Sequence, residues 1–130
     1  AGLPGIPLAI ARPDLAFSLL DTNGKKTRFL NQVVGELGLP NVEVIRGRVE
    51  QLKRPAHYAR ISSRAFATLA ETVSLSQHLL ASGGCWLAMK GTEPAAEQAD
   101  LPPDIAANTV ELLVPGEPGR RHLVILSRDD

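Results

Sequence analysis

Short apolar runs alternate with helical patterns along most of this chain, and this alternation constrains its fold more than any other feature. Strands are expected at residues 15–20, 42–45, 58–62 and 85–89, and helices at residues 23–37, 66–80 and 93–100. Residues 109–114 and 122–126 flank a Pro/Gly turn and are expected to close the sheet as an antiparallel pair. Strands that alternate with helices are typical of a mainly parallel sheet covered on both faces, so the pattern predicts an α/β fold.

The chain opens with a glycine–proline loop, AGLPGIPLAI, ahead of the first expected strand. Gly2 and Gly5 permit backbone turns that other residues resist, and Pro4 and Pro7 suit the first turn of a helix. The apolar residues that follow predict a short buried helix that ends before Pro13. A glycine turn that opens a helix presents backbone N–H groups to cofactors in α/β proteins, although the complete G-x-G-x-x-G motif is absent.

Composition excludes several classes of protein. The chain has 130 residues, of which 44% are apolar and 22% charged, as in an ordinary soluble domain. Lys+Arg and Asp+Glu number 14 each, so net charge favours neither a nucleic-acid nor a membrane partner, and no apolar run approaches a membrane span. The single cysteine, Cys85, excludes an internal disulfide and fits a reducing cytoplasm, and without a Cys/His cluster no metal site is expected.

Charged or polar side chains follow four successive expected strands, at the edge where sheets of this type bind ligands. They are Asp21, residues 46–50, Ser63 with Arg64, and Lys90 with Gly91. As a set they predict a binding site, with ordinary polar loops as the alternative.

Asp21 lies close to the spacing at which dinucleotide-binding folds place a carboxylate on ribose hydroxyls. The alternative is an aspartate that forms a cap or an Asx turn at the start of helix 23–37. Lys25, Lys26 and Arg28 lie in the first turns of that helix, where the dipole disfavours cations, which hints at an anionic partner such as a phosphate backbone. A solvated helix face is the alternative there.

Side chains suited to catalysis are few. His57, His78 and His122 are scattered, there is no nucleophile elbow, and Cys85 begins an apolar strand as a small core residue would. An enzyme with this sequence would depend on positioning more than on proton transfer.

Six segments together resemble one bacterial family: GLPGIPLAI, LLDTNGKKTRFLNQV, GRVEQL, SSRAFA, MKG and RRHLVI. Over nearly its whole length the chain is similar to the ribosomal RNA small-subunit methyltransferase G family, also called glucose-inhibited division protein B. The resemblance implies a Rossmann-like class I methyltransferase fold, a three-layer sandwich with a mostly parallel sheet. It also implies methyl transfer from S-adenosyl-L-methionine to N7 of a guanine in 16S ribosomal RNA or the small ribosomal subunit.

The resemblance assigns site residues by position. Cofactor contacts are expected at Gly2, Leu3, Asp21, Val49, Glu50 and Arg64. RNA contacts are expected at Lys25, Lys26, Arg48, Lys90 and Arg121. Guanine N7 has a lone pair and no proton, so its methylation needs no general base, which suits the few catalytic candidates. Enzymes that methylate exocyclic amines are similar to one another in an Asn/Asp-Pro-Pro-aromatic motif, and SSRAF stands in its place here.

The sequence departs from the family in two ways. Ala59 stands where members often have an acidic residue. The family's N-terminal helices, first strand and Asp-x-Gly-x-Gly turn would precede Ala1, so residues 1–130 are expected to form a single, N-terminally truncated domain. Without that central strand, residues 15–20 and 58–62 would each expose an unpaired strand edge.

Two other functions stay open from the sequence. A nicotinamide-dependent oxidoreductase would also use an aspartate after a glycine loop. A non-catalytic RNA-binding or assembly module would need no catalytic residues.

Overall fold

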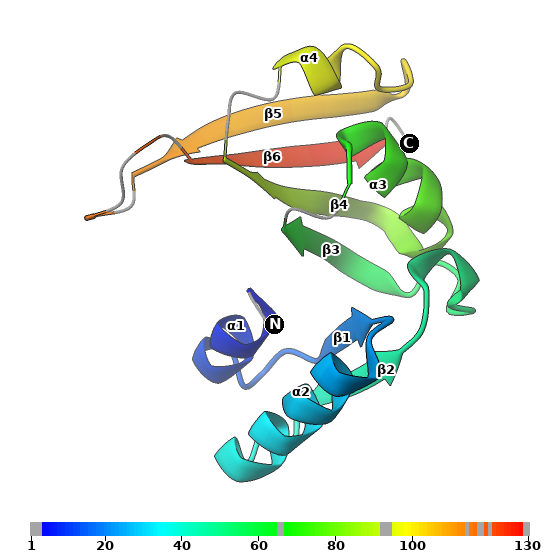
Figure 1. Cartoon of the computed structure of the whole chain (residues 1–130). Helices are drawn as coiled ribbons and strands as arrows, with labels where there is room; N and C mark the ends of the chain where they lie inside the picture. The colour runs from blue at the N-terminus through cyan, green and yellow to red at the C-terminus, as the bar shows by residue number, and fades with distance from the viewer. Residues whose placement is uncertain are drawn as a thin grey trace. The chain divides into compact units, whose positions relative to one another are not determined.

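The computed structural model describes residues 4–64, 67–91, 95–113, 115–116, 119 and 121–128. The chain forms two compact units, Ala1–Leu52 and Lys53–Asp130 (Figure 1). The single domain expected from the sequence stays a prediction. Among the helices of the described residues, none is long and apolar enough to cross a membrane.

The first unit contains a parallel two-stranded sheet. Its elements are α1 (Gly5–Ala11), β1 (Phe17–Asp21), α2 (Gly24–Leu37), β2 (Val42–Arg46) and the 3-10 helix η1 (Val49–Gln51). β1 and β2 pair in register from Phe17 opposite Val42 to Asp21 opposite Arg46. The strands and the helix expected between residues 15 and 45 are therefore confirmed, and α2 provides the crossover between the two strands.

The ends of α2 follow from its sequence. The Asn23 side chain accepts hydrogen bonds from the backbone N–H groups of Lys25 (2.9 Å) and Lys26 (3.2 Å), which satisfies two amides that have no partner within the helix. At the other end Gly38 has φ of 62°, a left-handed conformation that glycine adopts without strain.

The apolar faces of both helices in this unit are only partly covered. In α1, Ala9 is buried but Leu8 and Ile10 are exposed, so the buried helix expected at this point is wrong for these two residues. In α2, Leu30 is buried, whereas Phe29 and Leu37 are each 53% exposed. The expected helical period is correct, but the two strands that the described part of this unit contains form too narrow a surface to cover every apolar position.

The second unit contains a four-stranded mixed sheet. Its elements are β3 (Tyr58–Arg64), α3 (Leu69–Ser76), the 3-10 helix η2 (Gln77–Leu79), β4 (Leu80–Lys90), α4 (Ala95–Gln98), β5 (Ile105–Leu112) and β6 (Arg121–Arg128). The strand order is β3-β4-β6-β5, with β3 parallel to β4 and β6 antiparallel to both of its neighbours. The expected closing antiparallel pair is therefore confirmed. The expected helix 66–80 ends earlier, because Leu80 already begins β4.

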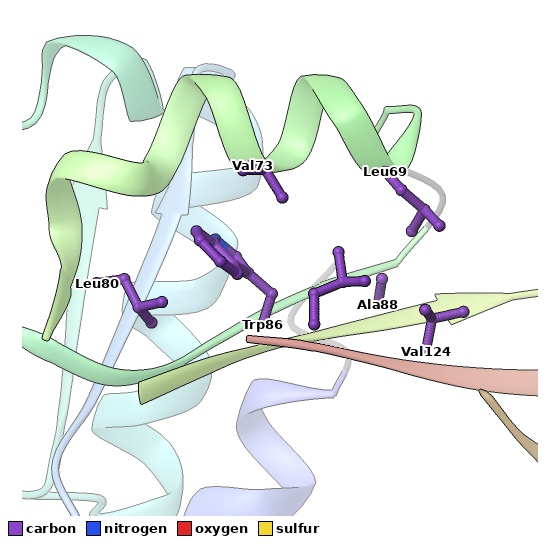
Figure 2. Close-up of a cluster of buried hydrophobic side chains, with 7 residues drawn as sticks. Leu69, Val73, Leu80, Trp86, Ala88 and Val124 are labelled. Atoms are coloured by element: carbon purple, nitrogen blue, oxygen red, sulfur yellow. The ribbon is translucent and has the colours of Figure 1, made fainter. Parts of the chain in front are cut away.

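The main core of the second unit lies between α3 and one face of this sheet, as Figure 2 shows. Its buried members are Leu69, Val73, Leu80, Trp86, Ala88, Val124 and Leu126. Trp86 is fully buried, and its indole Nε1–H donates to Ser76 Oγ at 2.8 Å, so the one polar atom of the ring has a partner. This core fixes the position of α3 over β4 and β6.

β1 and β3 are edge strands in their units. β1 pairs with β2 and β3 pairs with β4, and within the described ranges no strand pairs with the other side of either. This agrees with the unpaired edges expected at residues 15–20 and 58–62. A further strand alongside them stays a prediction.

Candidate functional site

Asp21 ends β1 and shapes the turn into α2. Its Oδ1 accepts a hydrogen bond from the backbone N–H of Asn23 at 2.8 Å, and its backbone carbonyl accepts one from the N–H of Gly47 at 3.0 Å. The Asx-turn interpretation of Asp21 is therefore confirmed. The bond to Asn23 uses one carboxylate oxygen, so the second oxygen can still accept from a ligand, and the ribose role stays a prediction.

A hollow of about 230 Å³ lies at the carboxyl ends of β1 and β2. Leu20, Ile45 and Leu52 contribute apolar surface to its lining, and Arg46, Arg48 and Gln51 contribute polar groups. An apolar surface with a few polar groups is typical of small-molecule sites, and this one lies where parallel sheets bind ligands. Asp21, Val49 and Glu50 are not among the residues that line it.

The two residues of η1 assigned by resemblance are next to this hollow in sequence. Val49 and Glu50 belong to the same 3-10 turn as Gln51, which lines it. Val49 is half-buried, whereas Glu50 is exposed. Glu50 Oε1 lies 3.7 Å from Arg48 Nη1, so the two side chains form an ion pair at the surface. The sequence did not single out Gln51 or Leu52, and their places in the lining depend on how the chain turns after β2.

Cations gather at the N-terminal end of α2. Lys25 and Lys26 are exposed in its first turn. The Arg46 side chain extends toward the same turn, since its Nε donates to Thr22 O at 3.4 Å and a Cβ on Gly24 would lie 2.9 Å from its Nη1. Glycine at position 24 therefore makes room for this guanidinium, which lies near the start of the helix that carries Lys25 and Lys26.

In the second unit the expected residues lie at the carboxyl ends of β3 and β4. Arg64 is the last residue of β3 and pairs with Met89, the residue before Lys90. Arg121 begins β6 next to His122, which pairs with Lys90, and a Cβ on Gly91 would lie 3.2 Å from Arg121 Nη1. The structure thus brings Arg64, Lys90 and Arg121 to one edge of this sheet.

Lys90 has partners inside the unit. Its side chain is only 16% exposed, and Nζ donates to Ala67 O at 2.6 Å and lies 3.1 Å from Glu97 Oε1. These contacts account for its ammonium group without any RNA. An RNA contact of Lys90 stays a prediction, and so do those of Lys25, Lys26, Arg48 and Arg121.

The remaining candidates add no catalytic group. Gly2 and Leu3 lie outside the described residues. Among the described residues no group of three or more His, Cys, Asp or Glu side chains is arranged to hold a metal ion. Cys85 is a half-buried residue of β4, as expected of a small side chain in a strand.

The fold is similar to those of two solved methyltransferases. The structure is similar to an rRNA methylase from Streptococcus thermophilus, with a TM-score of 0.65 and 16% identity over 98% of this chain and 82% of that one. It is also similar to precorrin-6y C5,15-methyltransferase from Geobacter metallireducens, with a TM-score of 0.65 and 14% identity over 94% of this chain and 73% of that one. At these identities the likeness concerns the fold alone, which is that of the class I methyltransferases.

Sequence comparison gives the family. The family model described as "rRNA small subunit methyltransferase G" matches residues 1–124. Ribosomal RNA small subunit methyltransferase G of Chromobacterium violaceum is 54% identical over 124 residues, which are 95% of this chain and 59% of that protein. The protein of the same name from Laribacter hongkongensis is 53% identical over 96% of this chain and 61% of its own length. The chain belongs to the rRNA small subunit methyltransferase G family, and it spans about three fifths of these relatives.

Proposed function

We propose that the protein containing this chain transfers a methyl group from S-adenosyl-L-methionine to N7 of a guanine in 16S ribosomal RNA, in the bacterial cytoplasm. The observation that carries this proposal is the family match across residues 1–124, joined by relatives more than half identical to the chain. The alternative of a nicotinamide-dependent oxidoreductase has no comparable support.

We propose that the nucleoside part of the cofactor binds at the carboxyl edge of the first unit's sheet, where parallel sheets bind ligands. Asp21 has acceptor oxygens suited to the hydroxyls of a ribose, and Val49 and Glu50 are proposed to lie beside the adenine. Gly2 and Leu3 are proposed to contact the same cofactor through the opening loop. When bound, S-adenosyl-L-methionine supplies a methyl group activated by its sulfonium charge.

The role of this chain's residues is then binding and orientation. Guanine N7 has its own lone pair, so no side chain has to remove a proton before attack, and alignment of the reacting atoms accounts for the catalysis required. Arg64, exposed at the carboxyl end of β3, is proposed to contact the cofactor or the RNA. Lys25, Lys26, Arg48 and Arg121 are all exposed and are proposed to bind RNA phosphates, which fix orientation without reading sequence.

The test uses the full-length protein with methyl-labelled S-adenosyl-L-methionine. The substrate is small ribosomal subunits from cells that lack the modification, with naked 16S RNA as a second arm. Label in the RNA is the expected result. If RNA binds but no label appears, the non-catalytic RNA-binding module is favoured instead.

Calorimetric titration separates the two cofactor classes. We expect S-adenosylhomocysteine to bind and NADH to give no heat above the dilution control. Tight NADH binding without S-adenosylhomocysteine binding would favour the oxidoreductase and contradict the proposal.

A further inference from the structure

One carboxylate oxygen joins three parts of the second unit. Glu97 Oε1 lies 3.1 Å from Lys90 Nζ and also accepts the backbone N–H of Leu69 at 3.1 Å. Lys90 Nζ donates in turn to Ala67 O at 2.6 Å. The end of β4, the start of α3 and the short helix α4 are therefore connected through two side chains.

The ion pair between Lys90 and Glu97 is largely shielded from water. The Lys90 and Glu97 side chains are 16% and 32% exposed, and a charge removed from water to this degree needs partners. Each group has them, since the ammonium meets a carboxylate and a carbonyl, and the carboxylate meets an ammonium and an amide. Removing one partner would leave the other charge partly buried and poorly compensated.

Helix α4 has a second side-chain contact with the rest of the unit. Gln98 Nε2 donates to Thr109 Oγ1 of β5 at 2.5 Å, so the residue after Glu97 is attached to the sheet. Glu97 is 28 residues from Leu69 along the chain, so its carboxylate caps α3 from a distant segment. It adds to the local cap, in which Thr68 Oγ1 accepts the N–H of Glu71 at 3.2 Å.

We propose that Lys90 and Glu97 are positioning residues for methyl transfer, and that they act by holding Ala67 and the start of α3. Ala67 is three residues beyond Arg64, the residue proposed to meet cofactor or RNA. Lys90 therefore acts through the backbone carbonyl of Ala67 rather than as a phosphate-binding cation. The inference rests on the proposed function for its effect on catalysis, whereas the contacts can be tested without it.

The two roles of Lys90 predict opposite effects of Glu97→Gln. If Lys90 binds RNA directly, loss of the carboxylate frees the ammonium, so RNA affinity stays the same or rises. If Lys90 and Glu97 are positioning residues, Glu97→Gln and Lys90→Met both lower kcat about tenfold, with KM for RNA within about twofold. The double variant then loses no more than either single one, because both remove the same contact.

The kinetic test uses these three variants in the full-length protein, with Glu36→Gln as the control. Glu36 is an exposed carboxylate of α2 whose Oε1 accepts from Gln32 Nε2 at 3.1 Å, so it carries the same charge change away from this cluster. The salt dependence of RNA binding should not change in any variant. A raised KM with a salt slope reduced by about one in Lys90→Met, together with unchanged kcat in Glu97→Gln, would overturn the inference.

Amide hydrogen exchange gives a readout without activity. Glu97→Ala removes the acceptor of the Leu69 amide, so its exchange should accelerate about tenfold, whereas Glu36→Ala should leave it unchanged. Unchanged exchange at Leu69 would contradict the inference. A wild-type protein that transfers no methyl group contradicts the proposed function instead, so the two failures are distinguishable.

Discussion

Asp21 and Arg46 end two parallel strands as paired residues, and both side chains then engage the turn that begins α2. Asp21 accepts the N–H of Asn23 at 2.8 Å, and Arg46 Nε donates to Thr22 O at 3.4 Å. A carboxylate and a guanidinium thus stabilise the same turn at the carboxyl edge of the first unit's sheet. A ligand at this edge would meet a pre-formed turn.

Asp21→Asn separates the turn role of this residue from its proposed cofactor role. Asparagine keeps an oxygen that can accept from Asn23, but it loses the charge and one acceptor. We expect the dissociation constant for S-adenosylhomocysteine to rise about tenfold or more, with little change in thermal stability. Calorimetry on the full-length protein measures the first effect.

Asp14→Asn is the matched control, because Asp14 is an exposed acid whose charge pairs with Arg12. Asp14→Asn should leave the dissociation constant for S-adenosylhomocysteine unchanged. Equal affinity of wild type and Asp21→Asn would show that Asp21 serves the turn only.

Arg64→Ala tests the end of β3. Its side chain is exposed, so the fold should tolerate the loss, and we expect methyl transfer to fall about tenfold or more. Arg60→Ala is the control on the same strand, since Arg60 is also exposed and its Nη1 donates to the neighbouring Ala59 O. If the two variants are equally active, Arg64 is a surface residue without a role in the reaction.

Ser76→Ala tests the hydrogen bond between Ser76 and the buried indole of Trp86. The change leaves the buried indole N–H of Trp86 without its acceptor, which should lower the free energy of unfolding by about 1–3 kcal/mol. Ser74→Ala changes an exposed serine of the same helix and should have an effect within about 0.5 kcal/mol. Urea denaturation compares the two, and equal losses would mean that the indole finds another partner.

The Arg12–Asp14 pair predicts a pH effect of defined sign. Hydrogen bonds from Arg12 to Asp14, at 2.9 and 2.7 Å, lower the pKa of the Asp14 carboxyl below its ordinary value. The ion pair therefore makes a small contribution to the free energy of unfolding at pH values above the unfolded-state pKa of Asp14. This contribution is lost as the pH falls through the folded-state pKa of Asp14.

Arg12→Ala should raise the pKa of Asp14 toward its ordinary value, as followed by the NMR shift of its side-chain carbons. The same titration in wild type provides the comparison. Identical midpoints in the two proteins would mean that the pair does not form in solution.

Local signals predicted much of the fold. Asn23 and Gly38 bound α2 as cap residues do, and the apolar runs locate β1 to β4. The sequence predicted that this strand begins at residue 85, after Gly83 and Gly84, whereas β4 begins at Leu80. In the structure they lie within the strand, near an irregularity in the β3–β4 register, and Gly83 has φ of 76°.

Tertiary contacts explain what sequence reasoning missed. Ala106, Ala107 and Asn108 have weak strand propensity, yet they are strand residues because β6 pairs with them. From the sequence, Lys90 is expected to contact RNA, and nothing local indicates a partner within the protein. Its contact with Glu97 forms because α4 folds back to the start of α3. Pairings between distant segments leave no local pattern in one sequence.

The most direct test of the proposed methyl transfer is nucleoside analysis of 16S RNA by mass spectrometry after incubation with the full-length protein and S-adenosyl-L-methionine. We expect new 7-methylguanosine in RNA from subunits that lacked it, and none without enzyme. Methyl groups found only on exocyclic amines, or no methylated product, would contradict it.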